Sequence, residues 1–108
     1  RESVVWFADY TTLIAGRFGD RVKRFATFNE PSIFNLFSRS LGKRDRSSEA
    51  GLYRATHHVN LAHGAAVDVL REKVQGASIG CIHNLQPCLP SGASEADAAA
   101  AAQNAPTM

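Results

Sequence analysis

Hydrophobic residues recur at helical spacing along two long stretches and form short continuous runs in two others. Apolar positions three and four apart predict a helix over residues 2–18 and a longer helix over residues 49–74. The apolar runs over residues 24–28 and 77–85 are typical of strands that are buried on both faces. The order helix, strand, helix, strand predicts an α/β fold with a βαβ unit, and we expect its two strands to be adjacent and parallel.

Turn and cap residues define the stretches between these elements. Gly19 fits the position just past the first helix, where a left-handed backbone is easy only for glycine, and Gly76 ends the second helix. The connection over residues 31–48 is apolar in its first half, so we expect it to fold over the protein with a short helical turn.

The C-terminal part of the chain is rich in alanine. Ser94, followed by Asp97 three positions later, resembles a helix cap, and the run over residues 95–102 predicts the helix that follows. The whole stretch over residues 95–108 lacks the large apolar side chains that would dock it, so we expect a frayed tail.

Polar residues stand where the first apolar run ends, in the segment Thr27-Phe28-Asn29-Glu30-Pro31. Pro31 has no backbone N–H to continue a strand, and it should hold Glu30 in an extended backbone. Asn29 and Glu30 would then lie at the carboxyl end of a core strand. That end carries the catalytic residues of α/β barrels, and a glutamate there can act as a general acid. The same residues would also suit a strand end that only meets solvent.

Composition and charge narrow the function classes. The chain of 108 residues has 44% hydrophobic and 20% charged residues, as in globular proteins generally. A net charge of +2 is too small to indicate a nucleic-acid partner, and no apolar run is long enough for a transmembrane helix. Cys81 falls in a strand and Cys88 in a loop, which favours free thiols in a cytoplasmic protein over a disulfide.

Two clusters suggest other chemistry. His57, His58 and His63 lie on the second long helix, but their spacing is not that of a helical zinc site. We expect no metal there and expect His63 to be a packed, hydrogen-bonded residue. The basic cluster over residues 39–46 could bind nucleic acid in a small helical protein, but it has no interleaved aromatic residues to stack on bases, so a solvated loop is expected.

Four ordered blocks carry a resemblance to a known family. The segment from Thr27 to Pro31 resembles the signature around the acid/base of family 1 glycoside hydrolases, the β-glucosidase family. Residues 18–23, 62–67 and 79–84 resemble that family in order and spacing. The resemblance implies a partial (β/α)8 barrel: residues 1–108 would be a segment of a single catalytic domain, about its fourth and fifth strands.

The resemblance also implies an activity and roles for three residues. The family's members are retaining enzymes with two glutamates, and Glu30 corresponds to the acid/base. Asn29 corresponds to the asparagine that binds the sugar 2-hydroxyl, and Asn84 to one near the leaving group. The implied protein is a β-glucosidase that cleaves O-glycosyl bonds of small β-glycosides without a cofactor. Glutamate at position 30, where myrosinases carry glutamine, fits that activity.

Other functions remain open. A 6-phospho-β-glycosidase or β-galactosidase would share the same motif, and a non-catalytic remnant or binding module would share the same fold. The family's nucleophile, in a Glu-Asn-Gly motif, does not occur among the 108 residues, so we expect the segment alone to be inactive.

Overall fold

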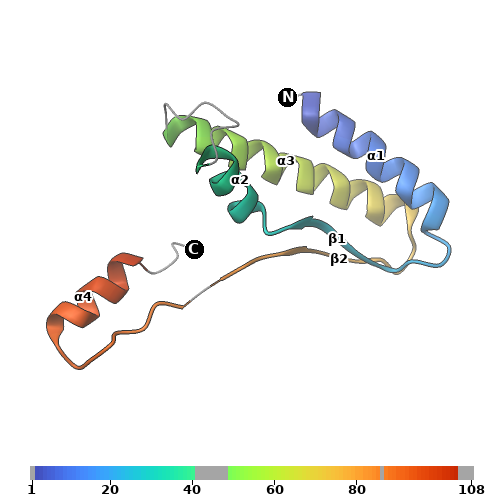
Figure 1. Cartoon of the computed structure of the whole chain (residues 1–108). Coiled ribbons are helices and arrows are strands. Elements are labelled where there is room, and N and C mark those ends of the chain that lie inside the picture. Colours follow the sequence, from blue (N-terminus) through green and yellow to red (C-terminus); the bar gives the residue numbers. More distant parts are fainter. Residues whose placement is uncertain (1, 41–48, 86, 105–108) are drawn as a thin grey trace.

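The computed structural model describes residues 2–40, 49–85 and 87–104, and these form four helices and two strands (Figure 1). In chain order the elements are α1 (Glu2–Phe18), β1 (Arg24–Asn29), α2 (Pro31–Ser40), α3 (Glu49–Lys73), β2 (Ser78–Ile82) and α4 (Glu95–Asn104). The predictions of two long helices, two strands and a C-terminal helix are confirmed. Strand β2 is shorter than the apolar run over residues 77–85, and α2 is a helix of ten residues where a short turn was expected.

Strands β1 and β2 are adjacent and parallel, as predicted. The first three residues of β1 pair in order, with Phe25 opposite Ile79 and Ala26 opposite Gly80. The next pair is Asn29 with Ile82, so β1 has advanced by three residues while β2 has advanced by two. This extra residue is a β-bulge, which bends a strand and changes the direction of the side chains that follow.

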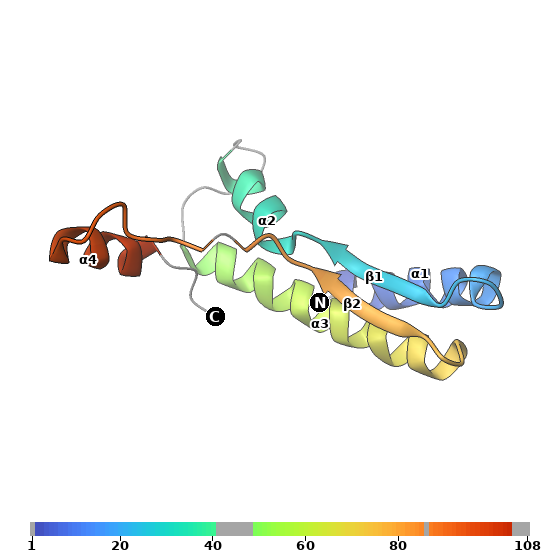
Figure 2. The same ribbon diagram turned by 90° about the horizontal axis from the view of Figure 1, so that it is seen from below.

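Both long helices lie on one side of this two-stranded sheet. The strands lie below α1 and α3 in Figure 1 and in front of them in Figure 2, which views the molecule from below. The opposite face carries Ala26, Gly80 and Ile82, all of them exposed. The expectation that both strand faces are buried is therefore wrong for these residues. The α3 crossover and α1 cover the same side, and no element of the described chain covers the other.

The buried core lies where the strands begin. Ala15 of α1 packs with Leu70 and Val74 near the end of α3, and Phe25 and Ile79 of the strands pack against them, together with Ala77. The contact between α1 and α3 is lined by small side chains, which let the two helices pack closely. Ala15, Ala62 and Ala66 are at most 5% exposed.

Glycines end both long helices for different reasons. Gly76 follows α3 with a φ of 73°, the left-handed conformation expected there. Gly19 does not adopt a left-handed backbone, contrary to the expectation. A Cβ at Gly19 would instead meet the carbonyl oxygen of Ala15 and the side chain of Val74. Glycine is required at position 19 because α1 and the end of α3 meet there.

Helix α4 lies apart from the rest, at the end of an extended segment (Figure 1). Its cap has the predicted form: Ser94 Oγ accepts a hydrogen bond from the Asp97 backbone N–H at 3.1 Å and donates one to Asp97 Oδ2 at 2.6 Å. The radius of gyration is 18.0 Å, against about 13 Å for a compact domain of this length. The described residues therefore form an open unit with much uncovered surface.

Residues 41–48, which hold most of the basic cluster, lie outside the described residues. Among the helices that are described, none is long and apolar enough to cross a membrane.

Candidate active site

Three backbone hydrogen bonds hold Glu30 in place. Its N–H donates a hydrogen bond to the carbonyl oxygen of Ile82 at 2.8 Å, which ties it to the end of β2. Its own carbonyl oxygen accepts hydrogen bonds from the N–H groups of Ile33 and Phe34, so Glu30 caps α2. Pro31 occupies the first position of that helix, where a missing N–H costs nothing.

Glu30 has a φ of 48°, in the left-handed region that a glutamate rarely adopts. The expectation that Pro31 holds Glu30 in an extended backbone is therefore wrong. The reason is that Glu30 must leave β1 and enter α2 within one residue, and its hydrogen bonds to Ile82 of β2 and to α2 require this turn. Non-glycine residues in such conformations cluster at functional sites.

The three predicted site residues meet at one edge of the sheet. Asn29 is the last residue of β1 and pairs with Ile82, the last residue of β2. Glu30 follows directly, and Asn84 comes two residues after the end of β2. Asn29 and Asn84 are exposed, and Glu30 is half-buried. The parallel strands thus bring all three to the carboxyl edge, as the βαβ prediction required.

The β-bulge decides which way Asn29 faces. With strict alternation, Phe25, Thr27 and Asn29 would share the helix-covered face of β1. Instead Phe25, Thr27 and Phe28 are half-buried, while Asn29 is exposed. The extra residue turns Phe28 toward the helices and leaves Asn29 on the open face. This bulge was not predicted from the sequence, although the break in alternation at Phe28 was a visible signal for it.

Thr27 joins the bulge to its neighbours. Its Oγ1 lies 2.7 Å from His63 Nδ1 of α3, and it donates a hydrogen bond to the Gly80 carbonyl oxygen at 3.3 Å. Cys81 Sγ lies 3.5 Å from the Phe28 carbonyl oxygen and is a free thiol. His63 is half-buried and hydrogen-bonded, as expected for a packed histidine.

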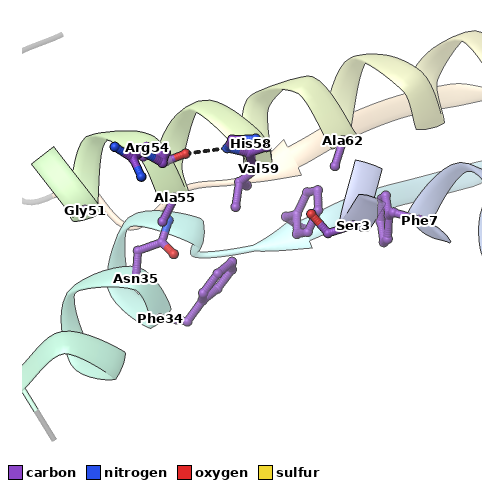
Figure 3. Close-up of a pocket in the computed structure, with 11 residues that line it drawn as sticks. Ser3, Phe7, Phe34, Asn35, Gly51, Arg54, Ala55, His58, Val59 and Ala62 are labelled. Atoms are coloured by element: carbon purple, nitrogen blue, oxygen red, sulfur yellow. Dashed lines mark hydrogen bonds between the residues drawn. The ribbon is translucent and has the colours of Figure 1, made fainter. Parts of the chain in front are cut away.

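A groove of about 450 Å³ lies on the helix side of this strand end, between α1, α2 and α3 (Figure 3). Phe28 stacks on Phe7 with ring centroids 4.6 Å apart and lies 6.3 Å from Phe34. Asn35 is 3% exposed, donates to Thr56 Oγ1 at 3.5 Å and leaves its Oδ1 without a partner. Glu30, Asn29 and Asn84 do not line this groove.

The charged groups of the described residues do not indicate a second catalytic or metal site. A hydrogen bond from Arg21 lowers the pKa of Asp20, and hydrogen bonds from Ser94 and then Ser91 lower the pKa of Asp97. Both carboxylates are exposed and lie away from the carboxyl edge of the sheet. No group of three histidine, cysteine, aspartate or glutamate side chains in this part of the chain could hold a metal ion.

Comparison with known proteins bears on this geometry. The family model described as glycosyl hydrolase family 1 matches residues 1–108. The chain is 37% identical over 98 residues to the β-glucosidase of Agrobacterium sp.. This alignment covers 88% of this chain and 21% of that enzyme. It is 34% identical over 99 residues to β-glucosidase A of Thermotoga maritima, covering 90% of this chain and 22% of the relative.

The folds agree as well. The structure superposes on the β-glucosidase of Thermotoga maritima in complex with deoxynojirimycin with a TM-score of 0.80 and 33% identity, covering 95% of this chain and 24% of that one. The chain thus spans about a fifth to a quarter of the length of these relatives.

Proposed function

Because the chain belongs to glycosyl hydrolase family 1 and forms part of its (β/α)8 barrel, we propose that it carries the acid/base of a retaining β-glucosidase. The activity would be hydrolysis of terminal β-D-glucosides. One observation carries the proposal: Glu30 is held in a rare backbone conformation at the carboxyl edge of two parallel strands. The names of the relatives support glucosides as the substrate class.

In this mechanism Glu30 acts twice. Its carboxylic acid protonates the glycosidic oxygen as the bond to the anomeric carbon breaks, and its carboxylate then takes a proton from the water that releases the sugar. A second carboxylate, supplied from outside these residues, forms the covalent intermediate. Retaining glycosidases hold their two carboxyl groups about 5–5.5 Å apart.

The two asparagines would bind the substrate beside Glu30. Asn29 faces the uncovered side of the sheet, which is the inner side of a barrel, and there its amide would bind the sugar 2-hydroxyl. That contact strengthens as positive charge develops on the sugar in the transition state. Asn84, at the same edge, would lie near the leaving group. This mechanism needs no cofactor, and its substrate is a small β-glycoside.

The proposal is tested by Glu30→Gln in the full-length protein that contains this chain. The change is isosteric and removes the transferable proton. We expect cleavage of a β-glucoside with a poor leaving group to slow by about 10²–10⁴-fold, the usual contribution of general acid catalysis. A dinitrophenyl glucoside needs little protonation, so formation of its glycosyl-enzyme, measured as the burst of dinitrophenol, should be nearly unchanged.

The matched control is Glu72→Gln, since Glu72 is exposed near the end of α3, far from this edge. It should leave both rates as in the unmodified protein. Equal slowing of both substrates by Glu30→Gln would show that Glu30 is not the general acid.

A further inference from the structure

One hydroxyl group connects the bulged end of β1 to both of its neighbours. Thr27 Oγ1 lies 2.7 Å from Nδ1 of His63, a residue of α3 that is 36 positions later in the chain. The same oxygen lies 3.3 Å from the carbonyl oxygen of Gly80 in β2. Thr27 and His63 therefore link three elements at one point.

The tautomer of His63 sets which of the two groups donates the hydrogen bond between His63 and Thr27. The Thr27 hydroxyl has a single hydrogen, and the Gly80 carbonyl can only accept it. If that hydrogen goes to Gly80, His63 Nδ1 must carry the hydrogen that it donates to the Thr27 oxygen. His63 then donates to Thr27, and Thr27 donates to Gly80.

These hydrogen bonds lie in the part of β1 that determines where the Glu30 side chain points. Thr27 is in the bulge between Ala26 and Asn29, three residues before Glu30. A shift of one residue in the register would turn Asn29 to the helix side and move Glu30 off its hydrogen bond to Ile82. A contact that holds the bulge therefore also holds the carboxylate.

Apolar packing at this end of β1 is less complete than at the start of the strand. The buried residues Leu70 and Val74 lie at the other end of the strands. Near Glu30, Phe28 contacts Phe7 and Phe34, but it also borders the groove of about 450 Å³ (Figure 3). Polar contacts, such as the one between Thr27 and His63, therefore contribute more to holding the strand at this end.

We propose that His63, acting through Thr27, is a positioning residue for Glu30, an inference that rests on the function proposed above. Its loss leaves the proton donor in place but misdirected. A displacement of about 1 Å at a reacting group can cost 10²-fold in rate. The expected loss is therefore about 10-fold to 10²-fold, and it should fall on the step that needs protonation.

The test uses full-length protein and four variants. His63→Leu and Thr27→Val remove the hydrogen bond, whereas His63→Asn keeps an N–H near the position of Nδ1 and Thr27→Ser keeps the hydroxyl. Each variant is assayed with a β-glucoside that has a poor leaving group and with a dinitrophenyl glucoside. His57→Leu is the matched control, because His57 is exposed on the same helix.

We expect His63→Leu and Thr27→Val to lower kcat/KM by about 10-fold to 10²-fold for the poor leaving group and much less for the dinitrophenyl glucoside. His63→Asn and Thr27→Ser should recover most of the loss, and His57→Leu should cause none. The double variant His63→Leu/Thr27→Val should be little worse than either single variant, because both remove one interaction.

Equal losses on both substrates, or a double variant whose loss is the product of the single ones, would overturn the inference. A lower melting temperature with an unchanged ratio between the substrates would show a purely structural role and overturn it too. Where His63→Leu does not fold, Thr27→Val, which changes one atom, decides the matter.

Glu30→Gln is assayed in parallel: if it shows the leaving-group effect and the His63 and Thr27 variants do not, this inference fails alone. If Glu30→Gln shows none, the proposed function fails and this inference with it.

Discussion

The two ends of the parallel strands are built differently. Where the strands begin, apolar side chains pack around Leu70 and Val74, each 2% exposed. Where they end, Asn29 and Asn84 are exposed, and Glu30 is held by backbone hydrogen bonds in a left-handed conformation. Packing fixes the first end and hydrogen bonds fix the second. The comparison teaches that this chain packs apolar residues at one end of its strands and places polar residues at the other, the end that carries the catalytic residues in α/β barrels.

The largest effect on stability should come from the packed end. We expect Leu70→Ala to lower the free energy of unfolding of the full-length protein by about 2–5 kcal/mol, because it leaves a cavity among buried residues. Leu61→Ala, the same change at a position of α3 that is 47% exposed, should cost about 1 kcal/mol or less. Denaturant unfolding measures both, and equal costs would contradict the placement of the core.

A glycine pair sharpens the comparison further. A Cβ at Gly19 would meet backbone of Ala15 and the side chain of Val74, so Gly19→Ala should cost about 1–3 kcal/mol through overpacking. A Cβ at Gly16, inside α1, meets nothing within 4 Å, so Gly16→Ala should stabilise by about 0.5–1 kcal/mol. Unfolding midpoints that shift in the same direction for both variants would refute the close contact at Gly19.

An effect on stability no larger than that of Gly16→Ala is expected at the carboxyl end of the strands. Glu30 carries the strain of a left-handed backbone, which glycine would adopt freely. Because the unfolded chain also gains freedom with glycine, we expect Glu30→Gly to stabilise by only about 0.5–1 kcal/mol while removing the proposed acid/base. A melting temperature below that of Glu30→Gln would show that the conformation of Glu30 is not strained.

Sequence patterns predicted those parts of the fold that repeat a regular spacing. The apolar stripe of α3 and the apolar run over residues 24–28 were sufficient to predict the helix, the strand and the parallel crossover. The motif from Thr27 to Pro31 was sufficient to predict that Asn29 and Glu30 lie at the carboxyl end of the first strand. These features are local, or follow from the general geometry of βαβ units.

The parts that sequence reasoning missed depend on contacts between elements. Pro31 favours an extended residue before it, but the hydrogen bonds of Glu30 to Ile82 and to α2 outweigh that preference. The bulge at Thr27 and Phe28 depends on both strands at once. Burial of both strand faces was inferred from an apolar run, which does not reveal whether other elements of the described chain cover the second face.

The central claim is that the carboxyl end of the strands carries an acid/base at Glu30. It is tested most directly by adding azide to the full-length Glu30→Gln variant during cleavage of a dinitrophenyl glucoside. Azide attacks the glycosyl-enzyme without needing a base, so it should speed turnover and yield β-glucosyl azide, whereas the unmodified protein yields glucose. If azide changes neither the rate nor the product, Glu30 does not deprotonate the water, and the assignment is wrong.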